Sequence, residues 1–137
     1  MTPDQIFAIV NPLAALSWLT LIVVPRRAAI VTGALVPALL AVLYAVLIAS
    51  HWSGADGGFS TLSEVARLFA SRWLLLAGWV HYLCFDLLVG TWQVQDARAR
   101  GIPHLLVVPC LVLTFLFGPA GWLLYKGLAS VHSRSKA

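Results

Sequence analysis

The sequence predicts an all-α integral membrane protein: a four-helix bundle with a short interfacial amphipathic helix between spans two and three. Apolar residues make up 61% of the chain and charged residues only 10%, whereas soluble domains carry roughly 25% charged residues. Four stretches reach the length of about 20 residues that a helix needs to cross a bilayer. A soluble core of this size could not bury so much apolar surface. We therefore expect residues 1–137 to form one transmembrane domain with the lipid bilayer as its partner.

The first two spans are expected over residues 5–25 and 28–50, neither of which contains Asp, Glu, Lys or Arg. A tight turn, Pro25-Arg26-Arg27, separates them. A cleaved signal peptide is not expected, because Asp4 stands where a basic segment would precede the apolar run.

An amphipathic helix is expected over residues 60–71, after a loop over residues 51–58 that is rich in Gly and small polar residues. Ser60 or Thr61 suits its N-cap, and Ser63 or Glu64 completes a capping box. Apolar residues recur with helical period and alternate with polar ones. Because the segment is too short to span, we expect it to lie on the membrane surface.

The third span is expected over residues 73–95, where Asp86 is the only acidic residue. A short basic turn follows, and Pro103 is placed to begin the fourth span over residues 104–125. That span contains no charged residue. With four spans, both termini lie on one side of the membrane and the two short turns on the other.

Basic residues normally mark the cytoplasmic side. We favour the short turns as cytoplasmic because their charge is densest, and we predict a multi-pass protein of a bacterial inner membrane. The short turns hold Arg26, Arg27, Arg98 and Arg100, and the opposite side holds Arg67, Arg72, Lys126, Arg134 and Lys136.

Several classes of function are excluded by spacing. The basic residues fall in connections and termini rather than on one face, so no nucleic-acid partner is expected. Cys84 and Cys110 form no CxxC pair, which argues against a disulfide framework or a metal site. His51 and His104 fall at opposite ends of the bundle, and His81 is about 15 Å in depth from His104, so no pair suits haem. We predict no cofactor and no metal.

Asp86 is the sharpest candidate for chemistry, because an ionisable group at membrane depth is costly and usually has a partner or a task. Tyr82 lies one turn earlier on the same face, and Trp79 and Gln93 are each seven residues away. His81 lies about 140° round the helix, where it could flank the same cavity from the other side. A neutral carboxyl in an apolar site can donate a proton or a hydrogen bond.

Helical rise places Asp86 about 10 Å and His81 about 18 Å from the side of the short turns. Polar or aromatic residues of other spans are expected at these two levels, where they could line a ligand pocket with Trp79. The alternative is that these groups only form hydrogen bonds between helices or pack in the core. The residues of other spans expected at these levels are Trp18 and Cys110 near Asp86, and Asn11 and Thr114 near His81.

Four stretches of the chain match the pattern of one known family. They are Phe7-x-x-x-Asn11-Pro12 through Trp18 to Pro25, Phe59 to Phe69, Trp79-x-His81-x4-Asp86-Leu87, and His104 through Pro109, Cys110, Gly118, Pro119 and Gly121. They carry a resemblance to the abscisic-acid-deficient-four-like family. It covers nearly the whole chain, and its plant members are plastid membrane proteins linked to neoxanthin synthesis. The Trp-x-His-x4-Asp-Leu motif in the third span is the most specific part.

The resemblance implies a carotenoid-related role. In the plant conversion an epoxide opens while a proton leaves the polyene, which is an isomerisation that needs an acid and a base. For such chemistry we would assign Asp86 as the acid, His81 as base or proton shuttle, and Tyr82 as a hydrogen-bond donor. Another apolar isoprenoid remains an alternative substrate. So does a non-catalytic membrane module that binds a pigment or lipid or scaffolds a partner complex, and a homo-oligomer stays open.

Overall fold

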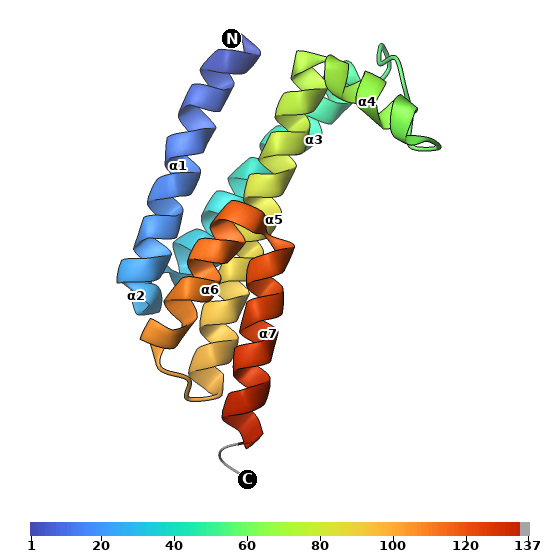
Figure 1. Ribbon diagram of the computed structural model, residues 1–137. Coiled ribbons are helices and arrows are strands. Elements are labelled where there is room, and N and C mark those ends of the chain that lie inside the picture. The colour runs from blue at the N-terminus through green and yellow to red at the C-terminus, as the bar shows by residue number, and fades with distance from the viewer. Residues whose placement is uncertain (135–137) are drawn as a thin grey trace.

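The computed structural model describes residues 1–134, and every regular element within them is a helix (Figure 1). Three stretches, Pro3–Val23, Val31–His51 and Arg72–Ala99, are long and apolar enough to cross a membrane. The all-helical fold is therefore confirmed, and these stretches overlap the first three predicted spans. In chain order the elements are α1 (Pro3–Val23), α2 (Pro25–Ile30), η1 (Val31–Leu35), α3 (Val36–His51), α4 (Leu62–Ala70), α5 (Arg72–Ala99), α6 (His104–Phe117) and α7 (Pro119–Arg134).

Helix α1 begins with a capping box, in which the Thr2 hydroxyl accepts from the Gln5 backbone N–H at 3.3 Å. The Gln5 side chain in turn accepts from the Thr2 N–H at 2.8 Å. The helix ends just before Pro25, which has no N–H to continue the ladder and instead starts α2.

The second long helical stretch contains a π-helical segment, η1, directly before Pro37. Pro37 cannot donate to the carbonyl one turn earlier. The wider turn compensates, because the Val36 N–H donates to the Val31 carbonyl five residues back.

Helix α4 confirms the predicted amphipathic segment and begins two residues later than expected. Thr61 is its N-cap, with a hydroxyl that accepts from the Glu64 N–H at 3.2 Å. The Glu64 carboxylate accepts from the Ser60 N–H at 3.1 Å. Arg67 reaches back to Asp56 at 3.7 Å, which holds the preceding loop against the helix.

Helix α5 is the centre of the molecule and contacts each of the other helices. Its packing against α3 is the most extensive, while α1 and the C-terminal helices lie on its other faces (Figure 1). Ala77, Val80 and Leu87 on α5 are completely buried. The middle of α5 is thus fixed in place by packing on several sides.

The predicted single span over residues 104–125 is replaced by two antiparallel helices, so the four-span bundle is not confirmed. Helix α6 ends at Phe117, and the chain reverses at Gly118, where φ is +41°. This left-handed region favours glycine. At Gly121 a side chain would meet the Thr114 backbone nitrogen at 2.1 Å, so the close approach of α7 to α6 also requires glycine. The sequence prediction placed no turn within residues 104–125.

The α6–α7 hairpin reaches only to the middle of α5, and α7 runs back beside the last turns of that helix (Figure 1). The two ends of the described chain therefore lie at opposite ends of the molecule, not on one side as predicted. Lys126 and Arg134 consequently join the end that holds the short turns. Lys136, which the prediction counted with them, lies outside the described residues.

Candidate functional site

Asp86 lies at the turn of the α6–α7 hairpin, near the middle of α5. A groove of about 310 Å³ opens there between Asp86, Val89, Gly118, Pro119 and Trp122. The side chain is half-buried, and its Oδ2 atom is buried without a hydrogen-bond partner among residues 1–134. Buried polar atoms are nearly always paired, and among residues 1–134 this oxygen is the one unpartnered buried atom that belongs to an acidic side chain.

The neighbouring Tyr82 binds the turn of the hairpin. Its hydroxyl donates to the Phe115 carbonyl at 3.0 Å. In a continuous helix this carbonyl would accept from residue 119, which is Pro119 and has no N–H. Tyr82 therefore satisfies the backbone acceptor that the turn leaves open.

His81 and Asp86 do not flank one cavity. The His81 ring stacks on Phe85 at 4.6 Å between ring centroids and meets Tyr44 edge-on at 5.5 Å. It lines a separate groove of about 590 Å³ between α3, α4 and α5, which is mainly aromatic and aliphatic. The other lining residues are Ile48, Trp52, Phe59, Leu68, Phe69, Leu74 and Gly78.

Thr114 lies much nearer the short turns than predicted. The buried Gln93 amide donates to its hydroxyl at 3.0 Å, and that hydroxyl donates to the Cys110 carbonyl at 2.8 Å. Gln93 is twelve residues beyond His81, or about 18 Å along the helix. Part of the cause is that α5 continues to Ala99 rather than ending at residue 95. This lowers the start of α6 by about 6 Å.

Trp18 and Cys110 are packing groups of the core. Trp18 is buried against Gly90 and meets the Phe115 ring at 5.6 Å. The Cys110 thiol is buried and lies 4.0 Å from the Leu106 carbonyl of its own helix. Neither residue lines the Asp86 groove.

Asn11 and Trp79 meet at the opposite half of α5, close to the predicted level. The Trp79 indole N–H donates to the Asn11 side-chain oxygen at 2.9 Å. The Trp79 ring also stacks on Tyr82 at 5.3 Å and contacts Phe7 at 6.0 Å. Together these contacts join α1 to α5 above the hairpin.

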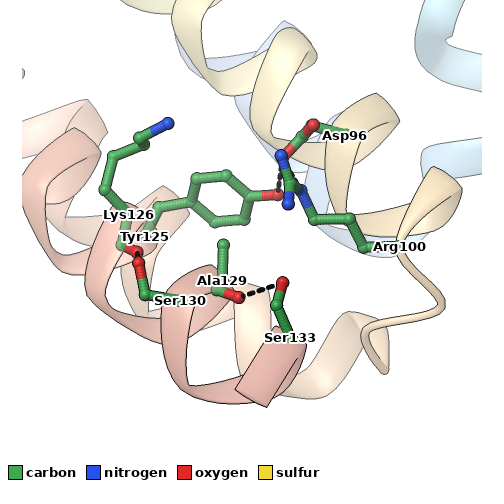
Figure 2. A network of polar contacts seen from close by, with 7 residues as sticks. All are labelled: Asp96, Arg100, Tyr125, Lys126, Ala129, Ser130 and Ser133. Carbon is green, nitrogen blue, oxygen red and sulfur yellow. Dashed lines mark hydrogen bonds and ion pairs between the residues drawn. The ribbon is translucent and has the colours of Figure 1, made fainter. Parts of the chain in front are cut away.

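A polar network that the sequence prediction missed holds the base of the hairpin (Figure 2). The Asp96 Oδ2 atom accepts from the Arg100 Nε at 2.6 Å and from the Tyr125 hydroxyl at 2.6 Å. Tyr125 is fully buried. The hydrogen bond from Arg100 to Asp96 raises the pKa of the guanidinium above its usual value. The four-residue spacing of Asp96 and Arg100 was the available signal.

Within residues 1–134 no group of three or more His, Cys, Asp or Glu side chains gathers as a metal site would require. Cys84 and Cys110 are both unpaired and buried. What the site offers is one half-buried carboxyl, with an unpartnered Oδ2 atom, beside an apolar groove. Such a group can exchange a proton with an apolar ligand or donate a hydrogen bond to it.

The family comparison agrees with the resemblance seen in the sequence. The profile described as ABA DEFICIENT 4-like matches residues 5–125. Neither a curated protein nor a solved structure matches the chain. The matched region includes the three long apolar helices, the α6–α7 turn and Asp86. The chain is therefore a membrane protein of the ABA DEFICIENT 4-like family.

Proposed function

We propose that this protein is a multi-pass membrane enzyme that isomerises a carotenoid or related isoprenoid by acid–base catalysis at Asp86. The observation that carries this proposal is the unpartnered Oδ2 atom of Asp86 beside the groove at the hairpin turn. An apolar polyene reaches such a groove from the lipid, because the groove lies beside the middle of a helix long enough to span.

The contrast with the other acidic side chains supports this role. Asp4 pairs with Arg72, Asp56 with Arg67, and Asp96 with Arg100. Glu64 caps helix α4. Asp86 is the remaining acidic residue of the five, and it forms no ion pair within the described part of the chain. Desolvation without a paired cation favours the neutral carboxyl, which is the form that can protonate a substrate.

A single carboxyl can serve an isomerisation that changes neither redox state nor proton count. The Asp86 O–H would protonate an epoxide oxygen as the ring C–O bond breaks. The carboxylate would then take the proton lost from the neighbouring carbon, which restores the acid. This route uses Asp86 alone, and it revises the assignment of His81 as the base, since His81 lines a different groove.

Membrane placement follows from the same geometry. We infer that α1, the η1–α3 stretch and α5 cross the bilayer, while α6 and α7 enter from one side and return to it. The end with the short turns then holds six basic residues, from Arg26 to Arg134, and one acidic residue, Asp96. The positive-inside rule makes this end cytoplasmic, in agreement with a bacterial inner membrane location.

The test is product formation from a 5,6-epoxy carotenoid by the purified full-length protein, analysed by chromatography and mass spectrometry. Asp86→Asn keeps the shape of the side chain and removes its acidity, so we expect loss of product. Glu64→Gln, at an acidic residue remote from the groove, is the matched control and should retain activity. Product formation by Asp86→Asn at the wild-type rate would overturn the catalytic assignment.

A non-catalytic pigment- or lipid-binding module is the second candidate function. The larger groove beside His81 favours it, because its aromatic walls suit a flat apolar ligand and it contains no carboxyl. In this case the purified protein carries a polyene, yet neither wild type nor Asp86→Asn forms product. Replacing the aromatic wall, as in Phe69→Ala, would then reduce the amount of bound pigment while Asp86→Asn would not.

A further inference from the structure

A second pocket lies at the end of the molecule that holds the short turns, far from the Asp86 groove. It has a volume of about 360 Å³ and is formed where α5 turns into α6, beside the start of α2. Its walls combine apolar groups with three polar side chains. The lining residues are Pro25, Val94, Gln95, Ala97, Arg98, Gly101, Ile102, Pro103 and His104.

The pocket is formed by a tightly bonded turn. The Ile102 N–H donates to the Ala97 carbonyl at 2.8 Å, and the Gly101 N–H donates to the Arg98 carbonyl at 3.1 Å. This is the hydrogen-bond pattern that closes the end of a helix. Ile102 and Ala97 are buried and form an apolar floor. The geometry around Arg98 is thus set by backbone bonds rather than by surface contacts.

His104 ties the pocket to a third segment. Its Nε2 atom lies 2.8 Å from the Ile22 carbonyl near the end of α1. Since a carbonyl can only accept, Nε2 carries the proton in this bond. The start of α6 is therefore held against the end of α1, and the pocket is enclosed between three parts of the chain.

The charge of this pocket is uncompensated. Arg67, Arg72 and Arg100 each pair with a carboxylate, whereas the exposed Arg98 side chain has no ion-pair partner among residues 1–134. Asp96, the one acidic side chain that residues 1–134 place at this end, already accepts from Arg100 and Tyr125. Two further arginines, Arg26 and Arg27, directly follow Pro25 in the sequence. An excess of positive charge of this kind attracts anions.

We propose that this pocket binds the phosphate headgroup of an anionic phospholipid. The Arg98 guanidinium suits two phosphate oxygens at once, and the Gln95 amide offers a further donor. Val94 and Ala97 of α5 and Ile102 of the following turn give the pocket an apolar wall beside the charged group, which suits the start of an acyl chain. Basic pockets between helices at the cytoplasmic surface are suited to such headgroups.

The test is native mass spectrometry of the full-length protein with equimolar dioleoylphosphatidylglycerol and dioleoylphosphatidylcholine. Wild type should retain the anionic lipid preferentially. Arg98→Gln should weaken this preference about fivefold, which corresponds to one basic residue near a charged membrane surface. Arg98→Lys keeps the charge and should lose less. The exposed position of Arg98 makes all three proteins comparable in folding, which gel filtration and thermal melting verify.

Two controls separate a built site from general attraction. Lys126→Gln removes a basic residue at the same end, where it lies over the Trp92 and Trp122 rings and not in the pocket. Arg67→Gln removes one at the opposite end. Neither should change the lipid preference. An unchanged preference in Arg98→Gln, or an equal loss in Lys126→Gln, would overturn the proposal.

A free phosphate compound is the other source of the same chemistry. Excess glycerol phosphate or inorganic phosphate should not displace the anionic lipid, because neither carries an acyl chain to contact the apolar wall. Displacement by either compound would show a site for a soluble anion and would overturn the lipid assignment. Neither result depends on Asp86, so this test is independent of the proposed enzymatic activity.

Discussion

Two carboxylates ten residues apart on α5 have opposite surroundings. Asp96 accepts hydrogen bonds from Arg100 and Tyr125, both at 2.6 Å (Figure 2). Asp86 faces the turn of the same hairpin, where its Oδ2 atom has no partner in the part of the chain that the structure describes. On the same helix, the carboxylate of Asp96 is therefore fixed by hydrogen bonds, whereas Asp86 keeps an oxygen free to bind a ligand.

The difference follows from what α7 brings to each carboxylate. The middle of α7 offers the hydroxyl of Tyr125, whereas its start offers Gly118, Pro119 and Trp122. None of the last three supplies an N–H or O–H that the structure shows bonded to Asp86. We infer that the Asp96 network fixes the hairpin on α5, and that the hairpin in turn presents an unpaired carboxyl to the groove.

The largest expected effect on stability separates these two residues directly. Asp96→Ala leaves the buried Tyr125 hydroxyl unpaired, and we expect it to lower the free energy of unfolding by about 2 kcal/mol. Asp86→Ala removes a half-buried carboxyl whose Oδ2 atom has no partner, so it should change stability by less than about 0.5 kcal/mol. Chemical unfolding in detergent measures both. Equal losses would mean that Asp86 is a structural residue.

A smaller effect tests whether the turn itself shapes the groove. Gly118→Ala places a side chain in a left-handed conformation and within 2.9 Å of the Asp86 Oδ1 atom. We expect a loss of about 1–2 kcal/mol. Gly54→Ala is the matched control, because no heavy atom lies within 4 Å of the added group. A Gly118→Ala variant as stable as wild type would contradict the observed turn.

The two tyrosines that attach the hairpin should differ modestly. Tyr125→Phe removes a hydrogen bond from a fully buried site, and Tyr82→Phe removes one from a half-buried site. We expect losses of about 1 kcal/mol for each, with the larger loss at Tyr125. Melting temperatures of the two variants in the same detergent show which loss is larger. A larger loss for Tyr82→Phe would indicate that the tip, not the base, anchors the hairpin.

The smallest effect provides a baseline for ion pairs. Arg67→Gln breaks an exposed contact with Asp56 at 3.7 Å, and we expect a change within about 0.5 kcal/mol. A loss as large as that of Asp96→Ala would show that exposure does not distinguish the pairs. Burial would then no longer explain why the Asp96 network matters more for stability than an exposed ion pair.

Local sequence signals located much of the candidate site. Asp86 was identified because an acidic residue is conspicuous in an apolar helix. Asn11 and Trp79 were predicted at neighbouring levels and do meet, because both lie on helices that run through the molecule. His81 was grouped with Asp86 by distance along the helix, yet it faces a groove formed by α3 and α4. Helical period gives the angle between two side chains but not which neighbour covers each of them.

The sequence by itself determined the helical class, the lipid environment, three long apolar helices and the amphipathic helix α4, because composition and periodicity are local properties. Only the tertiary structure decided that the last apolar segment turns back at Gly118. A Gly-Pro pair permits either a kink or a reversal. Packing of Gly121 on Thr114 and the bond from Tyr125 to Asp96 select the reversal. That choice also places the C-terminal basic residues with the short turns, and it opens the groove beside Asp86.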